Sequence, residues 1–292
     1  MKSRLFCFGL GYSALVLARR LRAVGWQVAG TAREADRVRE LTGLGIDAWR
    51  FDRDHPLPEA ALVGATHVLS SVPPDTAGDP VLDHCAEAIV AAGSSLRWIG
   101  YLSTTGVYGD YRGAWVDETS PLRPSVDRAW RRVAAETAWL DLHRQHGLPV
   151  HVFRLAGIYG PGRSAIDDVR DGTARRIVKR GQVFSRIHVE DVATALRASM
   201  DRPNPGAIYN VCDDEAARPQ DVIAFACALL GAAPPPEIPY EQAQLSPMAQ
   251  TFWVDNKRVR NDRIKQELGV ALIYPTYREG LRALVDQEKL PP

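Results

Sequence analysis

The stretch that most constrains the fold, Ser3 to Val24, joins a hydrophobic run to a glycine turn and then to a helical pattern. Leu5 to Phe8 is a short continuous apolar run, which suits a strand buried on both faces of a parallel sheet. Gly9 and Gly11 open a turn directly after it. Apolar residues then recur at three- and four-residue steps, as on one face of a helix that Gly25 ends: Ala14, Leu17, Ala18, Leu21 and Val24.

The turn itself, Gly9 to Ala14, fits the dinucleotide-binding fingerprint GxGxxG/A. Gly9 makes the turn, Gly11 lets a pyrophosphate approach the backbone, and the small Ala14 permits close packing of helix on strand. The free amides at the start of the helix, around Tyr12 and Ser13, would hold the phosphates. The alternative is a glycine turn that serves packing alone.

Bulk properties exclude several classes of protein. The chain has 292 residues and a net charge of +1, and it carries no basic stripe, so neither nucleic acid nor an anionic membrane is an expected partner. Its four cysteines lack disulfide or zinc spacing, which favours a reducing cytoplasm. We find no signal peptide and no stretch apolar enough to span a bilayer.

A second strand, Trp26 to Thr31, should end where the adenosine ribose of the cofactor lies. The acidic residue usual there is missing, and the cofactor-binding candidates at this point are Thr31, Arg33 and Arg37. Cations at this point favour a ribose that carries a 2′-phosphate, so we expect NADP, with NAD as the alternative cofactor. Both arginines could instead lie on a solvated helix face.

The next two strands supply further cofactor candidates. Asp47 to Phe51 ends in Asp52, whose carboxylate could accept a hydrogen bond from an adenine amino group or could be a turn aspartate. Thr66 to Ser71 leads into a rigid loop that should line the cofactor trough. The candidates in this strand end and loop are Ser70, Ser71, Val72 and Pro73.

A fifth strand, Leu96 to Ser103, follows the helical pattern Pro80 to Ala92. It delivers Ser103, Thr104 and Thr105 to the carboxyl end of the sheet, where ligands bind in open α/β folds. These hydroxyls are catalytic candidates, and ordinary turn capping is their alternative role. The pattern as a whole predicts an α/β, Rossmann-type doubly wound parallel sheet.

From the fifth strand onward the chain resembles the extended short-chain dehydrogenases/reductases, the NAD-dependent epimerase/dehydratase group. Five segments carry the resemblance in order: YLSTTGVYGD, DETSPLRP, FRLAGIYGPGR, RIHVEDVATAL and IYNVCDDE. The tail DNKRVRNDRIKQELGV, followed by YPTYREGL, is also similar. GxGxxA in place of the group's GxxGxxG indicates an atypical branch.

The chain departs from this group at the catalytic helix after Pro124. Where the group has Tyr-x-x-x-Lys before an Ala-Ala-Glu stretch, this chain has Arg128 and Arg132. The difference does not depend on alignment, because no lysine lies between residues 2 and 179 and no tyrosine between 111 and 159. An arginine stays protonated and cannot replace the acid/base pair, but it can bind an anion. Arg128 and Arg132 either clamp an anionic substrate or are simply exposed.

The resemblance implies roles for a few other residues. Thr104 lies four residues before Tyr108, the spacing of the group's catalytic Ser or Thr, and Tyr108 is either a replacement acid/base or a packing residue. His188 and Asp191 should be structural. The candidate substrate-binding cations are the two arginines of the catalytic helix and two later ones: Arg128, Arg132, Arg163 and Arg186.

The resemblance also sets the expected organisation and function. A dinucleotide-binding domain over residues 1–160, completed by about 182–212, should be joined by a smaller substrate lobe over 213–292 and the loop 161–181. The function that the resemblance implies is that of an NAD(P)-dependent oxidoreductase or epimerase/dehydratase acting on a small carbonyl or hydroxyl substrate, with sugar nucleotides as one class. The alternative is a non-catalytic NAD(P)-binding redox sensor. A homodimer is retained as a candidate assembly.

Overall fold

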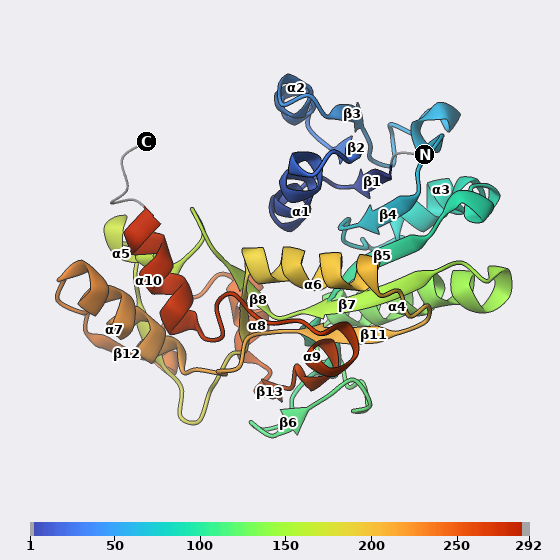
Figure 1. Ribbon diagram of the computed structural model, residues 1–292. Coiled ribbons are helices and arrows are strands. Elements are labelled where there is room, and N and C mark those ends of the chain that lie inside the picture. The colour runs from blue at the N-terminus through green and yellow to red at the C-terminus, as the bar shows by residue number, and fades with distance from the viewer. Residues whose placement is uncertain (1–2, 288–292) are drawn as a thin grey trace. The chain divides into compact units, whose positions relative to one another are not determined.

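A computed structural model describes residues 3–287. Figure 1 shows the chain coloured from its amino to its carboxyl end, with helices and strands labelled where there is room. The strands are β1 (Arg4–Phe8), β2 (Gln27–Ala32), β3 (Asp47–Arg50), β4 (His67–Ser70), β5 (Trp98–Thr104), β6 (Trp115–Val116), β7 (Val150–Leu155), β8 (Gly157–Tyr159), β9 (Arg176–Val178), β10 (Arg186–His188), β11 (Ile208–Val211), β12 (Glu237–Pro239) and β13 (Arg258–Val259). The α-helices are α1 (Tyr12–Ala23), α2 (Ala35–Gly43), α3 (Pro80–Ala91), α4 (Asp127–His146), α5 (Ala165–Arg170), α6 (Val189–Asp201), α7 (Pro219–Leu230), α8 (Pro247–Trp253), α9 (Asp262–Leu268) and α10 (Tyr277–Gln287).

The main sheet confirms the predicted fold class. It has seven strands in the order β11-β7-β5-β4-β1-β2-β3, and the pairings from β5 through to β3 are all parallel. The chain runs from β1 outward to β3 and then returns to the other side of β1 with β4. This reversal is the topological switch point at which ligands bind in doubly wound sheets.

Helices cover both faces of the sheet. Trp139 and Leu140 of α4 and Ile89 of α3 pack with Phe6 and Phe8 of β1 in one buried cluster. On α1, Arg20 donates a 2.9 Å hydrogen bond to Thr194 of α6. Strands buried on both faces explain why the sequence shows continuous apolar runs in place of alternation.

Local signals set the helix ends. Asp79 caps α3 by accepting hydrogen bonds from the amides of Val81 and Leu82, and Pro80 occupies the first turn. Gly231 ends α7 in the left-handed conformation, at φ 64°.

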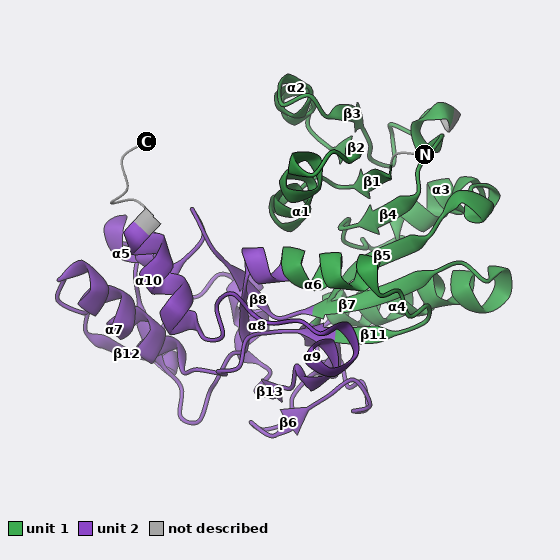
Figure 2. Ribbon diagram, in the orientation of Figure 1, with its two compact units in different colours: residues 1–104, 127–154, 193–209 green, residues 105–126, 155–192, 210–292 purple. Residues whose placement is uncertain are grey.

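The chain divides into two compact units (Figure 2). Unit 1 comprises residues 1–104, 127–154 and 193–209, and unit 2 comprises 105–126, 155–192 and 210–292. Residues 105–126, which the sequence analysis places in the dinucleotide-binding half, belong to unit 2, where β6 pairs with β13. β8 likewise pairs with β10 inside unit 2.

Candidate functional site

Most predicted site residues of unit 1 gather at one edge of the sheet. Because the five strands from β5 to β3 are parallel, their carboxyl ends all lie at this edge. β1 lies between β2 and β4, so the glycine turn after β1 has the ends of these two strands as its neighbours. The edge therefore has the arrangement of a dinucleotide site in an open α/β sheet.

The turn at Gly9 is held by both neighbouring strands. The Gly9 amide donates to the Thr31 hydroxyl at 2.9 Å, and the Ser71 hydroxyl donates to the Gly9 carbonyl at 2.5 Å. Gly9 has φ +80°, and a Cβ built on it would lie 2.8 Å from the Ser71 Oγ. Only glycine fits this position without strain.

Gly11, by contrast, faces open space. It is the N-cap of α1, and a Cβ built on it would meet no described atom within 4 Å. As the N-cap, Gly11 has no side chain that could cap α1, while Ser13 is buried and Ala14 is fully buried. The open space at Gly11, at the start of a twelve-residue helix, fits a pyrophosphate, which is the reason predicted for this glycine.

The two arginines predicted at the end of β2 differ in whether their side chains form an ion pair. Arg37 forms a 2.6 Å ion pair with Glu40 on the surface of α2. This contact favours the alternative in which Arg37 lies on a solvated helix face. Arg33 is exposed, and its side chain has no partner within the described part of the chain. Thr31 is buried and holds the glycine turn, so its predicted contact with cofactor is at most indirect.

Asp52, after β3, makes the contacts of a turn aspartate. Its Oδ1 accepts hydrogen bonds from the Asp54 amide at 2.9 Å and from the His55 ring at 2.7 Å. The His55 hydrogen bond holds the pKa of the Asp52 carboxyl below its usual range. A contact between Asp52 and the adenine would use the other carboxylate oxygen, Oδ2, and stays a prediction.

The end of β4 combines a buried and a partly open segment. Ser70 is fully buried, and its Oγ has no hydrogen-bond partner among the described residues. Ser71 fixes the glycine turn, Val72 is half-buried and Pro73 is exposed. A Cβ on Gly9 would also lie 3.3 Å from the Val72 side chain, so this segment borders the turn as the trough requires.

The adjacent hydroxyls at the end of β5 have different surroundings. Ser103 is 5% exposed and donates a 2.5 Å hydrogen bond to Oε1 of Glu136 on α4. Thr104 is half-buried and, as the next residue along a strand, points to the opposite face. Thr104 is thus the better placed of the two to reach a ligand.

Sequence reasoning missed the ion pair behind Ser103. Arg154 of β7 contacts both carboxylate oxygens of Glu136, at 3.1, 3.2 and 2.8 Å, and each side chain is 3% exposed. The available signal was a glutamate on the apolar face of α4, one turn after Arg132. This network joins β5, α4 and β7 directly behind the catalytic candidates.

Arg132, at the position of the group's lysine, points into unit 1. Its Nη1 donates to the Tyr101 hydroxyl and to the Leu102 carbonyl, both at 2.9 Å. Burial raises the pKa of Tyr101 well above its usual range, so this tyrosine does not supply the missing acid/base. Arg128 lies half-buried one turn earlier on α4. The anion clamp stays a prediction.

Unit 2 holds Thr105 and Tyr108, which form a 3-10 turn. Thr105 is half-buried, whereas Tyr108 is fully buried and donates a 2.7 Å hydrogen bond to Oδ1 of Asn210. These contacts favour the packing role for Tyr108 over the acid/base role.

Arg186 lies in a buried polar cluster of unit 2. Its Nη1 donates to the carbonyls of Phe184 and Ala217, and burial lowers its pKa. Nearby Asp213 is 3% exposed, and burial raises the pKa of its carboxyl well above the usual range. Arg163 is exposed. Substrate contacts by Arg163 and Arg186 stay predictions.

His188 and Asp191 have the contacts expected of structural residues. Asp191 is fully buried and accepts hydrogen bonds from the amides of Ile273 and Tyr274, at 2.6 and 3.0 Å. His188 accepts from the Glu190 amide at 3.2 Å and packs on Tyr274. Together they tie α6 to the segment before α10.

A second polar cluster that sequence reasoning missed lies around Lys257 in unit 2. Its ammonium donates to the Gly109 carbonyl at 2.9 Å and lies 3.4 Å from Oδ2 of Asp255, whose Oδ1 accepts a 2.5 Å hydrogen bond from Ser125. Burial lowers the pKa of Lys257. The segments meet only through the tertiary fold, so no local spacing in the sequence indicates this cluster.

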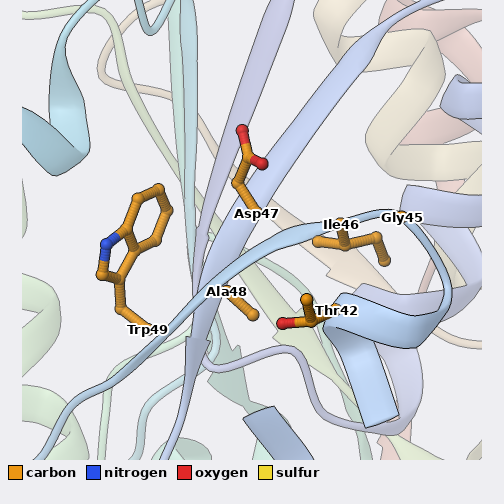
Figure 3. Close-up of a pocket in the computed structure, with 6 residues that line it drawn as sticks. All are labelled: Thr42, Gly45, Ile46, Asp47, Ala48 and Trp49. Carbon is orange, nitrogen blue, oxygen red and sulfur yellow. The ribbon is translucent and has the colours of Figure 1, made fainter. Parts of the chain in front are cut away.

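A shallow pocket of about 370 Å³ lies where α2 leads into β3 (Figure 3). Ile46 and Asp47 contribute to its lining at the amino end of β3. Ligands of doubly wound sheets bind at the carboxyl ends, so this pocket is not part of the candidate site.

No group of three or more His, Cys, Asp or Glu side chains in residues 3–287 could hold a metal ion. No helix in the same residues is long and apolar enough to cross a membrane.

Comparison with known proteins places the chain among relatives of this architecture. A structure of a functionally unknown conserved protein from Silicibacter pomeroyi is 52% identical, with a TM-score of 0.91 over 99% of this chain and 100% of that one. A crystal structure of dTDP-glucose 4,6-dehydratase from Bacillus anthracis in complex with NAD is 15% identical, with a TM-score of 0.75 over 99% and 97% of the two chains, and shows the shared fold.

Proteins related by sequence are also similar to this chain. Protein YeeZ of Escherichia coli (strain K12) is 31% identical over 213 residues, which cover 70% of this chain and 75% of YeeZ. A dTDP-glucose 4,6-dehydratase of Streptomyces niveus is 31% identical over 122 residues, 38% of this chain and 35% of that protein. The NAD dependent epimerase/dehydratase family matches residues 80–212. The chain therefore belongs to the NAD-dependent epimerase/dehydratase family of extended short-chain dehydrogenases/reductases.

Proposed function

We propose that this protein binds NADP(H) at the carboxyl edge of unit 1 and uses it to oxidise, reduce or epimerise a small hydroxyl or carbonyl substrate. The observation that carries the proposal is the contrast between two glycines. Gly9 is held tightly by Thr31 and Ser71, while Gly11 leaves the start of α1 open. A rigid turn beside an open helix start is what pyrophosphate binding requires.

The chain's own residues would divide the work. The α1 amides bind the phosphates, and Thr31 and Ser71 fix the turn that presents them. When bound, the nicotinamide accepts or donates a hydride. Thr104 orients a substrate oxygen through its hydroxyl, because Ser103 already donates its proton to Glu136. The exposed Arg33 at the end of β2 supports NADP over NAD.

Proton transfer needs a route without the usual tyrosine and lysine. Arg132 keeps its proton at all relevant pH values, and its Nη1 is committed to Tyr101 and Leu102. The proton therefore passes through the Thr104 hydroxyl or through a water beside it.

Sugar nucleotides are the first substrate class to test, since the dehydratases among the relatives carry dTDP-glucose in their names. Oxidation or reduction of NADP(H) is followed by absorbance across sugar nucleotides and small carbonyl compounds, and epimers are separated by chromatography. Turnover that falls at least about 100-fold in Thr104→Ala supports the site. Undiminished turnover in that variant overturns it.

A second function has its own support. The hydroxyl of Tyr108 donates to Asn210 and that of Ser103 to Glu136, so two of the four catalytic candidates are engaged within the protein. This arrangement suits a protein that binds the dinucleotide without turnover and reports its redox state. Saturable NADPH binding with no turnover across the screen would support the sensor.

A further inference from the structure

The end of β3 places a cation beside the end of β2 that the sequence pattern does not reveal. Arg50, the last residue of β3, pairs with Ala32, the last residue of β2. Its Nε donates a 3.0 Å hydrogen bond to the carbonyl of Arg33. The Arg50 side chain therefore crosses from the edge strand to the point where β2 ends.

The two terminal nitrogens of Arg50 are open. Within the described part of the chain, the only side-chain contacts of Arg50 are those of its Nε, with the Arg33 carbonyl and, at 3.6 Å, with Asp52. The side chain is 46% exposed. A guanidinium anchored at Nε presents its other N–H groups in a fixed plane, which suits an oxyanion with several acceptor atoms.

The neighbouring charges favour an anion at this point. Arg33, which directly follows β2, has no side-chain partner in the described residues, and Arg50 pairs with the last residue of β2, so this strand end carries two arginines. Asp52 offsets part of the Arg50 charge, but its Oδ1 is already occupied by His55 and the Asp54 amide. Arg37 is paired with Glu40 and contributes less.

We infer that Arg50, together with Arg33, forms the recognition site for the 2′-phosphate of the dinucleotide, and that Arg50 is a residue that determines the preference for NADP(H) over NAD(H). The inference rests on the proposed dinucleotide site. It adds a residue from β3 that spacing after the fingerprint cannot find, because Arg50 reaches the end of β2 only through strand pairing.

The test is calorimetric binding of NADPH, NADH, 2′,5′-ADP and 5′-ADP to wild type, Arg50→Ala and Arg39→Ala. Arg39 is the matched control, since it is an exposed arginine of α2 paired with Asp36 and its loss changes the net charge equally. Arg50→Ala should weaken NADPH and 2′,5′-ADP about 10-fold and leave NADH nearly unchanged. Arg39→Ala should weaken none of them by more than about 2-fold.

Each outcome decides something different. Equal losses in Arg50→Ala and Arg39→Ala overturn the assignment of Arg50 and leave the proposed function standing. Equal binding of NADPH and NADH by wild type removes the 2′-phosphate site altogether, although the dinucleotide site survives. Absence of saturable binding of either nucleotide overturns both the inference and the proposed function.

Discussion

The Oγ of Ser103 lies 2.5 Å from Oε1 of Glu136, which Arg154 also holds, so a hydroxyl at the carboxyl end of β5 points into a buried ion pair. Ser103 and Thr104 are neighbours in sequence, but only Thr104 is left on the face away from this network. The two hydroxyls should therefore respond differently to removal.

We predict that Thr104→Ala loses most turnover while Ser103→Ala keeps it. Ser103→Ala removes one hydrogen bond to Glu136 and should lower the free energy of unfolding by about 1 to 2 kcal/mol. With an active substrate, kcat should fall in Thr104→Ala and change less than about 3-fold in Ser103→Ala at a temperature where both are folded. The reverse ranking would contradict the assignment.

Breaking the buried ion pair should destabilise unit 1 strongly. Glu136→Gln leaves the Arg154 charge buried without a carboxylate, at a cost of about 3 to 5 kcal/mol in the free energy of unfolding. Urea denaturation measures this cost. Asp141→Asn, which removes an exposed partner of Arg144, is the control and should change little. A small effect of Glu136→Gln would show that the pair does not hold the end of β5.

Acid should weaken the protein through His151. The ring is fully buried, and its Nε2 accepts a 2.9 Å hydrogen bond from the Asn204 amide, which requires the neutral form. Burial lowers its pKa from 6.5 to about 4. The stabilisation is complete above pH 6.5 and is lost as pH falls toward 4, up to about 3 kcal/mol.

A variant of His151 separates the pH dependence of stability due to this ring from that due to the carboxylates. Urea unfolding at pH 7.5 and at pH 4.5 should show that His151→Gln is less stable than wild type at the higher pH and that the difference narrows at the lower. His146→Gln, at an exposed position, should follow wild type at both. A difference that stays constant with pH would show that His151 titrates normally.

The fold was accessible from the sequence because buried parallel strands leave continuous apolar runs. The predicted strands around Leu5, Leu69 and Ile99 coincide with β1, β4 and β5 to within two residues at each end. The glycine turn could also be predicted from the sequence, because its two glycines and Ala14 directly follow one of these apolar runs.

The residues that were missed depend on pairing between distant segments. Arg50 reaches the end of β2 through strand register, Arg154 meets Glu136 across 18 residues, and Lys257 meets Gly109 across 148. In each case the two residues do not share a helix or strand, so the periodicity within one element does not indicate the contact. The burial of Tyr108 and Ser103 could not be predicted from the sequence either. The sequence does not distinguish a hydroxyl that faces a ligand from one that is hydrogen-bonded inside the core.

The two glycines of the turn should separate stability from binding. Gly9→Ala places a methyl group 2.8 Å from the Ser71 Oγ at a left-handed backbone position, so it should lower the free energy of unfolding by about 1 to 3 kcal/mol. Gly11 has φ −82° and open space around it, so Gly11→Val should cost at most about 1 kcal/mol. Equal stability of the two variants would contradict this account of the turn.

The most direct measurement for the central claim is calorimetric titration of wild type and Gly11→Val with NADPH. Wild type should bind saturably, and Gly11→Val, folded to the same extent by circular dichroism, should lose at least about 10-fold in affinity because its side chain occupies the space of the pyrophosphate. No saturable binding by wild type at millimolar NADPH or NADH, or full affinity in Gly11→Val, would contradict the proposed dinucleotide site.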